Sequence, residues 1–328
     1  MEGMDSIFLA HDPGGYDVIH PVYIRFRQDK TTRPELFLTG VLGEQHSEYA
    51  IGESDVLKNL KARIERNESF SLITGTSWHS TVETDAIYIC KKKHIITVSI
   101  LDYWCNYRNR FRNGDDFIFP DHLLVMDDLA KNEAVEEGIN EGIIHIVGHP
   151  GLDYYVNKKI RKKHNKKILF LSQPLSALYG DSYGYTEFTA LEGVLKAGEE
   201  LGYSVDIKFH PKETDKMVKK YEDFAVEGAI EELAGEYEVV IGMSTMGLLQ
   251  LSIMGVPVIS YQPEMKLKDY CITNKLGITR GAYSYDDLIE LLKEVRIDQN
   301  MEYPFWYDGK STERCYKYLR GIIQGNGG

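Results

Sequence analysis

Residues 239–261 read VVIGMSTMGLLQLSIMGVPVISY and show the alternation of apolar runs and helix-like stretches that indicates the fold. A short apolar run, Val239–Gly242, is followed by hydroxyl-bearing residues, by the helix-like stretch Gly247–Met254 and by a second apolar run, Val256–Tyr261. Short continuous apolar runs are typical of strands that are buried on both faces of a parallel sheet. The segment therefore predicts a strand–helix–strand unit, with its polar residues at the carboxyl end of the first strand.

The same alternation runs along the rest of the chain. Further strands are predicted at Ser6–Ala10, Leu36–Thr39, Ser71–Gly75, Ile95–Leu101, His122–Met126, Ile143–Val147, Ile168–Ser172 and Ser204–Phe209. Helices are predicted at Tyr16–Arg27, Glu53–Glu65, Thr81–Lys92, Asp128–Gly138, Glu187–Leu201, Thr214–Tyr221, Tyr285–Val295 and Ser311–Gln324. The basic stretch 154–167, YYVNKKIRKKHNKK, interrupts the alternation and is typical of a solvated linker or helix face. The pattern predicts an α/β protein with two Rossmann-like domains facing a central cleft, residues 1–155 and 166–308.

The composition limits the kinds of partner. The 328 residues include 38 Lys and Arg against 50 Asp and Glu, a net charge of −12. This balance argues against a general nucleic-acid-binding protein, because neutralising phosphates needs a basic surface. Cys90, Cys105, Cys271 and Cys315 form no CxxC pair, which favours free thiols over a zinc site. No apolar run approaches the ~20 residues of a membrane span, so we expect a cytoplasmic protein. Peripheral membrane attachment and the oligomeric state stay open.

In the second half, polar residues follow three strands at their carboxyl ends, where open α/β sheets bind ligands. These residues are Ser172, Gln173 and Pro174, then His210, Pro211 and Lys212, and finally Met243, Ser244 and Thr245. A helix start that carries hydroxyls can bind phosphate oxygens, and an imidazole and an ammonium group can neutralise them. We expect His210 to lie within reach of Ser244 and Thr245, as it would if they followed neighbouring strands. The alternative is that Ser244 and Thr245 only cap a helix.

The first half has a polar turn of its own, His11-Asp12-Pro13-Gly14-Gly15, between the first strand and the first helix. Gly14 and Gly15 carry no side chains that would block a sugar, and the helix start that follows favours an anion. His11 and Asp12 are titratable groups at the same edge, so they are candidates for a general base. The alternatives are a tight turn without a ligand, or Asp12 serving as the helix cap.

Two later loops of the first half add hydroxyl, aromatic and charged groups. The candidates for binding an acceptor are Thr76, Ser77, Trp78, His79, Tyr107 and Arg108, because aromatic rings stack on sugars and guanidinium groups bind anions. The acids Glu83 and Asp102 accompany these loops as further catalytic candidates. The alternative for the earlier loop is a helix cap at Ser80 or Thr81, with Glu83 completing a capping box. The alternative for the later loop is an ordered surface loop held by its aromatic residues.

Together these residues resemble GT-B glycosyltransferases and the related UDP-N-acetylglucosamine 2-epimerase fold. The similarity is strongest to bacterial sialyltransferase-like and capsule polysaccharide enzymes. It is carried by Phe209-His210-Pro211-Lys212, Met243-Ser244-Thr245 and the turn Ser172-Gln173-Pro174-Leu175. In those families a His-Pro motif and a downstream Ser-Thr motif hold the nucleotide phosphates of the donor. The resemblance covers residues 166–308 and implies that the terminal helix, 311–324, packs back onto the first domain.

The leading hypothesis is a glycosyltransferase that moves a sugar from a CMP-sialic-acid-like or UDP-sugar donor to a glycan acceptor. Neither a cofactor nor a metal is expected, because no DxD triplet is well placed and His, Lys and amide groups can stabilise the leaving phosphate. The alternative is a nucleotide-sugar 2-epimerase or hydrolase, in which Asp102 and Glu83 transfer protons at the sugar. A third hypothesis is an inactive GT-B scaffold that binds a partner.

Overall fold

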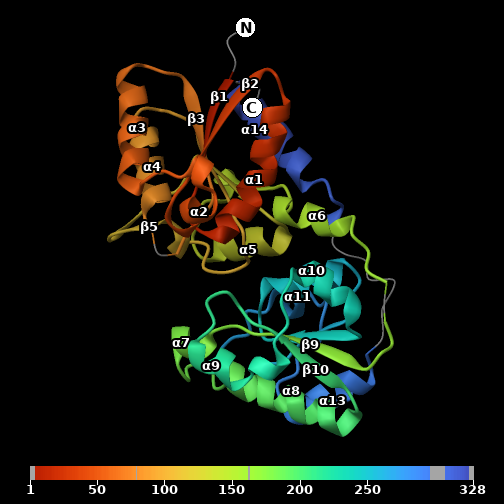
Figure 1. Cartoon of the computed structure of the whole chain (residues 1–328). Coiled ribbons are helices and arrows are strands. Elements are labelled where there is room, and N and C mark those ends of the chain that lie inside the picture. The colour runs from red at the N-terminus through yellow and green to blue at the C-terminus, as the bar shows by residue number, and fades with distance from the viewer. Residues whose placement is uncertain (1–3, 79, 162, 296–306, 325–328) are drawn as a thin grey trace. The chain divides into compact units, whose positions relative to one another are not determined.

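The chain forms two compact units, each with its own sheet. The computed structural model describes residues 4–78, 80–161, 163–295 and 307–324. Unit 1 comprises residues 1–154 together with 304–328, and unit 2 comprises residues 155–303. Each unit has a parallel β-sheet with helices packed against it (Figure 1). The predicted α/β class with two Rossmann-like sheets is therefore confirmed.

The described part of unit 1 has a six-stranded parallel sheet in the order β2-β1-β3-β4-β7-β8. Its strands are β1 (Met4–Ala10), β2 (Thr32–Leu38), β3 (Phe70–Thr74), β4 (Thr97–Ile100), β7 (His122–Val125) and β8 (Ile144–Ile146). Every residue of β3 and β4 is buried, as expected for strands covered on both faces. The strand order reverses between β1 and β3, so the loops after these two strands flank the topological switch point, where such sheets bind ligands.

The helices of unit 1 include several that the periodicity predicts and some that it does not. They are α1 (Pro13–Gln28), α2 (Gly40–Gln45), α3 (Glu53–Glu65), α4 (Val82–Lys91), α5 (Asp128–Glu136) and α14 (Ser311–Ile323). The chain passes from unit 1 to unit 2 within the short helix α6 (Asp153–Val156). A small antiparallel hairpin joins β5 (Arg112–Asn113) to β6 (Asp116–Phe117). Helix α2 and this hairpin were not predicted, because neither is long enough to show a period; α2 buries only Leu42.

The described part of unit 2 has a four-stranded parallel sheet in the order β10-β9-β11-β12. Its strands are β9 (Lys167–Leu171), β10 (Ser204–Lys208), β11 (Val239–Gly242) and β12 (Val258–Ser260). Its helices are α7 (Leu175–Tyr179), α8 (Glu187–Leu201), α9 (Asp215–Lys220), α10 (Ile230–Leu233), α11 (Met246–Ile253), α12 (Ile272–Lys275) and α13 (Tyr285–Lys293). The expectation that the loops after β10 and β11 follow neighbouring strands is wrong, because β9 lies between these strands. The switch point lies between β9 and β11.

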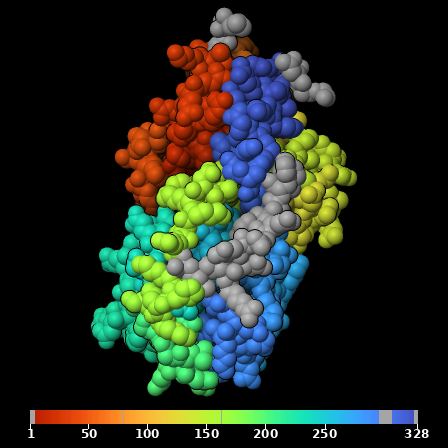
Figure 2. Space-filling view, turned by 90° about the vertical axis from the view of Figure 1, so that its right-hand side faces the viewer, coloured from red at the N-terminus to blue at the C-terminus, as the bar shows by residue number. Residues whose placement is uncertain are grey.

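Helix α14 follows unit 2 in the sequence but belongs to unit 1, where it packs against α1 (Figures 1 and 2). Its apolar face buries Cys315, Tyr316, Leu319 and Ile322 in the same core cluster as residues of α1 and of the central strands. These four positions follow the spacing of one helix face. The core of unit 1 is therefore complete only when the end of the chain is in place.

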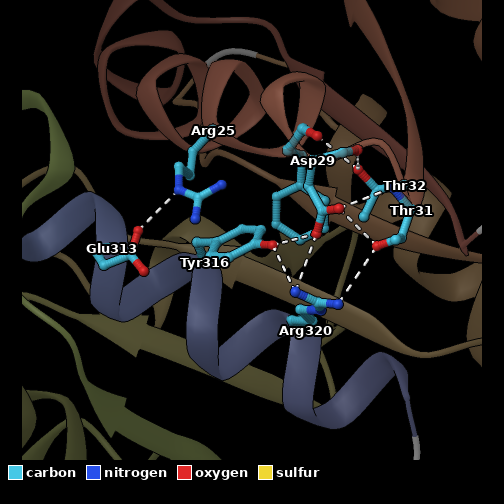
Figure 3. Close-up of polar contacts among 8 residues, drawn as sticks. Arg25, Asp29, Thr31, Thr32, Glu313, Tyr316 and Arg320 are labelled. Atoms are coloured by element: carbon cyan, nitrogen blue, oxygen red, sulfur yellow. Dashed lines mark hydrogen bonds and ion pairs between the residues drawn. The ribbon is translucent and has the colours of Figure 1, made fainter.

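A polar cluster at the carboxyl end of α1 holds α14 in position (Figure 3). The carboxylate of Asp29 accepts a hydrogen bond from the Tyr316 hydroxyl, and Arg320 Nη1 lies 3.2 Å from Asp29 Oδ2. Arg25 Nε donates to Glu313 at 2.9 Å, and the Arg25 guanidinium lies 3.9 Å from the centre of the Tyr316 ring. Hydrogen bonding, above all from Tyr316, holds the pKa of Asp29 well below its usual range.

Candidate functional site

The loops after β1 and β3 meet at the switch point of unit 1 in backbone contact. A Cβ atom on Gly75 would lie 2.6 Å from the Cα of Gly15, so glycine at both positions allows the loops to approach this closely. A Cβ atom on Gly14 would lie 2.0 Å from Oδ2 of Asp102, which follows β4. The two glycines that were predicted to admit a ligand therefore also admit Gly75 and the Asp102 carboxylate.

Asp102 is the acid at this edge of the sheet whose contacts best fit a role in proton transfer. Its Oδ1 forms an ion pair with Arg110, whose side chain is only 1% exposed, and accepts a hydrogen bond from Thr76 Oγ1 at 3.1 Å. Arg110 Nη1 also donates to Thr76 Oγ1 at 2.7 Å. The side chain of Asp102 is 17% exposed, and its Oδ2 has no hydrogen-bond partner among the residues that the structure describes. The Oδ1 atom of Asp102 is thus held by two partners, while Oδ2 can still form a hydrogen bond with a ligand.

Glu83 joins the first turn to the loop after β3. Its side chain is buried, the Ser77 hydroxyl donates to Oε2, and the main-chain N–H of His11 donates to Oε1 at 3.2 Å. Burial raises the pKa of Glu83 to about 7, although these hydrogen bonds oppose the shift. The predicted capping box is wrong, because Thr81 makes no side-chain cap bond and the Glu83 side chain is turned toward Ser77 and His11. The predicted cap at Ser80 is present, since Ser80 Oγ accepts the main-chain N–H of Val82 at the start of α4.

Asp12 also joins the turn after β1 to the loop after β3, and we call the place where these two loops meet the junction. It occupies the N-cap position of α1, yet its side chain makes no cap hydrogen bond, so the helix-cap alternative for Asp12 is wrong. Its Oδ2 accepts the main-chain N–H of Trp78 at 2.9 Å instead. The Trp78 side chain is 51% exposed, and the Arg110 guanidinium lies 5.5 Å from the centre of its ring.

His11, the other candidate base, turns toward α2 and α3. Its Nδ1 lies 2.9 Å from Thr39 Oγ1 and 3.2 Å from Glu53 Oε1. Its ring fills the space beside Gly40, which has a φ of +57°, and a Cβ atom there would lie 2.6 Å from the ring. The imidazole therefore has partners of its own at the edge of the turn.

Two residues predicted to bind an acceptor, Tyr107 and Arg108, do not gather with Asp102. Tyr107 is 1% exposed and donates its hydroxyl hydrogen bond to Glu133 of α5 at 2.7 Å. The main-chain N–H of Arg108 donates to Glu137 at 2.8 Å, so this residue also lies against the end of α5. His79 lies outside the described residues. Thr76 and Ser77 are at the junction but are buried, so they support its geometry more than they offer a surface.

Two residues that the sequence analysis did not select complete the junction. Arg110 lies in the same loop after β4 as Arg108, and its partners, not its spacing, distinguish it from Arg108. His149 follows β8, donates from Nε2 to the main-chain carbonyl of Asp102 at 3.0 Å and stacks on Trp104 with ring centres 5.9 Å apart. Burial lowers the pKa of His149, and its Nδ1 is buried without a hydrogen-bond partner. His149 stands two residues after the predicted strand Ile143–Val147, so its position at the end of a strand is the signal that could have identified it.

In unit 2 the loops after β9 and β11 are joined across the switch point. Gln173 Oε1 accepts the main-chain N–H of Ser244 at 2.8 Å. Thr245 caps α11 by accepting the N–H of Gly247 at 3.2 Å, so the capping alternative holds for this residue. The side chain of Met243 is fully buried in the core of unit 2, which leaves only its main chain for a ligand.

The remaining residues predicted to bind the nucleotide lie on either side of this point. Ser172 is buried and donates to Glu213, which was not predicted, and Pro174 is buried beside it. His210, Pro211 and Lys212 are exposed in the loop after β10, and His210 Nδ1 accepts the main-chain N–H of Lys212 at 3.1 Å. The imidazole and the ammonium group are therefore free to meet an anion from solvent.

The described residues also bear on metal binding and on membrane insertion. Among them, no three His, Cys, Asp or Glu side chains are grouped so that they could hold a metal ion. Of the helices that the structure describes, none combines the length and apolar character needed to cross a membrane.

No family model and no curated protein matches the sequence, but solved structures match its fold. UDP-GlcNAc 2-epimerase from Methanocaldococcus jannaschii matches with a TM-score of 0.70 at 16% identity, over 97% of this chain and 99% of that one. The Neisseria meningitidis enzyme bound to UDP-GlcNAc matches with a TM-score of 0.64 at 12% identity, over 97% and 100%. MurG from Acinetobacter baumannii matches with a TM-score of 0.58 at 9% identity, over 98% of each chain.

These likenesses extend over almost the whole of each chain and establish the fold. The protein has the GT-B fold, the fold shared by the UDP-GlcNAc 2-epimerases and MurG. The expected resemblance in fold, to GT-B proteins and to the UDP-GlcNAc 2-epimerases, is confirmed. The finer resemblance to sialyltransferase-like and capsule polysaccharide enzymes stays a prediction.

Proposed function

We propose that the protein is an enzyme acting on a UDP-sugar, of the UDP-N-acetylglucosamine 2-epimerase or hydrolase type. In this proposal unit 2 binds the nucleotide diphosphate and unit 1 supplies the groups that move protons at the sugar. The fold is consistent with it, because neighbours of the same fold include enzymes named as UDP-GlcNAc 2-epimerases, one of them bound to UDP-GlcNAc.

The observation that carries the proposal is the arrangement of hydrogen-bond partners around the carboxylate of Asp102. Its Oδ1 is fixed by the buried Arg110 and by Thr76, while Oδ2 faces the side-chain-free Cα of Gly14 at the start of α1. A carboxylate held in this way can accept or return a proton at a substrate atom within hydrogen-bond reach. Proton transfer at a sugar carbon or oxygen needs such a group, and it needs no metal ion.

The diphosphate would be held by groups in the loops after β10 and β11 of unit 2. The main-chain N–H groups at the start of α11 and the side chains of His210 and Lys212 are the donor types that bind phosphate oxygens. Gln173 Oε1 accepts the Ser244 N–H, so a phosphate oxygen that replaced it would use a donor already in position.

A turnover experiment tests the proposal. The protein is incubated with UDP-GlcNAc in D2O without an acceptor, and NMR follows solvent deuterium at C2, the C2 epimer and released UDP. We expect one or more of these products, and Asp102→Asn should lower their rate roughly 10²–10⁴-fold, the usual range for general acid–base catalysis. Asp115→Asn, in the exposed turn between β5 and β6, is the matched control and should not change the rate. Bound UDP-GlcNAc that stays unchanged would refute the proposal.

Glycosyl transfer is the second candidate, and the position of Asp12 favours it. Only one of the Asp12 oxygens has a hydrogen-bond partner among the described residues, and the side chain is partly exposed. The other oxygen could deprotonate an acceptor hydroxyl. UDP release that appears only when a glycan acceptor is added would support transfer over epimerisation.

A further inference from the structure

The strongest unexplained feature of unit 1 is the exposed indole of Trp78. Its two preceding residues, Thr76 and Ser77, are buried, while half of the Trp78 side chain remains exposed. A large aromatic side chain beside buried polar groups is a common anchor for a ligand, because it offers a wide apolar face that water cannot hydrogen-bond. Neither the packing of the core nor the proton-transfer role of Asp102 requires this ring.

The loop that carries Trp78 is held in place by two carboxylates from different elements. Asp12, before α1, accepts the Trp78 main-chain N–H at 2.9 Å. Glu83, in α4, accepts the hydroxyl of Ser77. Hydrogen bonds to two separate elements fix the loop at two points, and a site residue is most effective when its support fixes its geometry. The loop is thus built to present the indole in one orientation.

The indole and Asp102 contact the same guanidinium group. Arg110 forms the ion pair with Asp102, and its Cζ lies 5.5 Å from the centre of the Trp78 ring. This distance is within the range of a cation–π contact, which fixes one side of the ring. A ligand ring lying on the exposed side of Trp78 would therefore be next to the carboxylate with the free oxygen.

We propose that Trp78 binds the pyranose ring of the substrate by stacking, and that Asp12 is a positioning residue that holds Trp78 for this purpose. The inference rests on the proposed function, since it requires a ligand that carries a sugar. It names the part of the UDP-sugar that unit 1 recognises. It also gives Asp12 a role that depends on a hydrogen-bond acceptor and not on a base.

The first test compares two ligands that differ only in the sugar. Calorimetry gives the Kd values of UDP and UDP-GlcNAc for the wild type, Trp78→Phe and Trp78→Ala. We expect Trp78→Ala to weaken UDP-GlcNAc about 3- to 10-fold, the range of one aromatic stacking contact, and to leave UDP unchanged. Trp78→Phe should keep most of the affinity, because it keeps an aromatic face.

The second test separates positioning from base catalysis. In Asp12→Asn the amide oxygen can still accept the Trp78 N–H, whereas Asp12→Ala removes the acceptor. We expect Asp12→Asn to bind UDP-GlcNAc as tightly as the wild type, and Asp12→Ala to weaken UDP-GlcNAc as Trp78→Ala does, with the Kd of UDP unchanged in both variants. An Asp12→Asn variant that binds UDP-GlcNAc as weakly as Asp12→Ala would overturn the positioning role.

The outcomes also distinguish the two proposals. If UDP-GlcNAc binds and turns over but Trp78→Ala binds it as tightly as the wild type, the stacking inference is wrong and the proposed function stands. If neither UDP nor UDP-GlcNAc binds to the wild type, the proposed function is wrong and the inference falls with it.

Discussion

Replacing Glu83 by Gln should change how the stability of unit 1 depends on pH. Glu83 is buried, and burial raises the pKa of its carboxyl group to about 7. In the unfolded chain the same group titrates near pH ~4.3. Because the folded-state pKa is the higher one, the protonated group stabilises the fold fully below about pH 4.3, and this contribution is lost as pH rises through about 7.

The magnitude follows from the difference between the two pKa values. A difference of between two and three pKa units corresponds to about 3 kcal/mol. We therefore expect the wild type to lose about 3 kcal/mol relative to Glu83→Gln between pH ~4.5 and pH ~8, because the amide does not titrate. The amide oxygen can still accept the main-chain N–H of His11, so the variant should fold.

Urea unfolding at several pH values, followed by tryptophan fluorescence, measures this difference. Residues 155–303 contain no tryptophan, so the signal reports on unit 1. Glu65→Gln is the matched control, because Glu65 is exposed at the end of α3 and the charge change is the same. Parallel stability curves for the wild type and Glu83→Gln would refute the reasoning, since they would show that the pKa of Glu83 is the same in the folded and the unfolded protein.

Three further substitutions test other parts of the structure. Tyr316→Phe removes the hydroxyl that anchors α14 to the end of α1 and should lower the unfolding free energy by about 1 kcal/mol, as measured by the same urea titration. Gly14→Ala places a methyl group 2.0 Å from Oδ2 of Asp102, so turnover of UDP-GlcNAc should fall while the Kd of UDP stays constant; a fully active variant would contradict the role of this carboxylate. His210→Ala should leave the circular dichroism spectrum unchanged, because the residue is exposed, and should raise the Kd of UDP roughly 10-fold. An unchanged Kd would exclude His210 from the nucleotide site.

Regular elements could be predicted from the sequence because local signals and burial agree in them. Helix α8 was predicted with its observed bounds, Glu187–Leu201; it starts with a capping box at Thr186 and ends at Gly202 in the left-handed conformation. Strand β11 likewise has its predicted bounds, Val239–Gly242. The short elements α2 and α7 were missed, since five or six residues carry no measurable period.

The site could be predicted only as far as the loops that carry it. The rule that ligand-binding residues follow parallel strands selected the loops after β1, β3, β4, β9, β10 and β11. It could not say which side chains point inward from an irregular loop. Between Asp102 and Phe111 the chain passes through a short 3-10 turn, and this turn directs Arg110 to Asp102 and Arg108 to α5. Glu83 has the spacing of a capping box, and only the tertiary contact with Ser77 and His11 shows its other role.

The return of α14 to unit 1 sets an order for synthesis. Unit 2 is a continuous segment, residues 155–303, so all of it is translated before α14. The core of unit 1 includes Cys315, Leu319 and Ile322. Unit 1 therefore lacks part of its core until the whole of unit 2 has been translated. During that interval the apolar surface of α1 that α14 covers is open to other chains. A stop codon before Ser311 would therefore damage the unit encoded first, and leave intact the unit encoded next to the lesion.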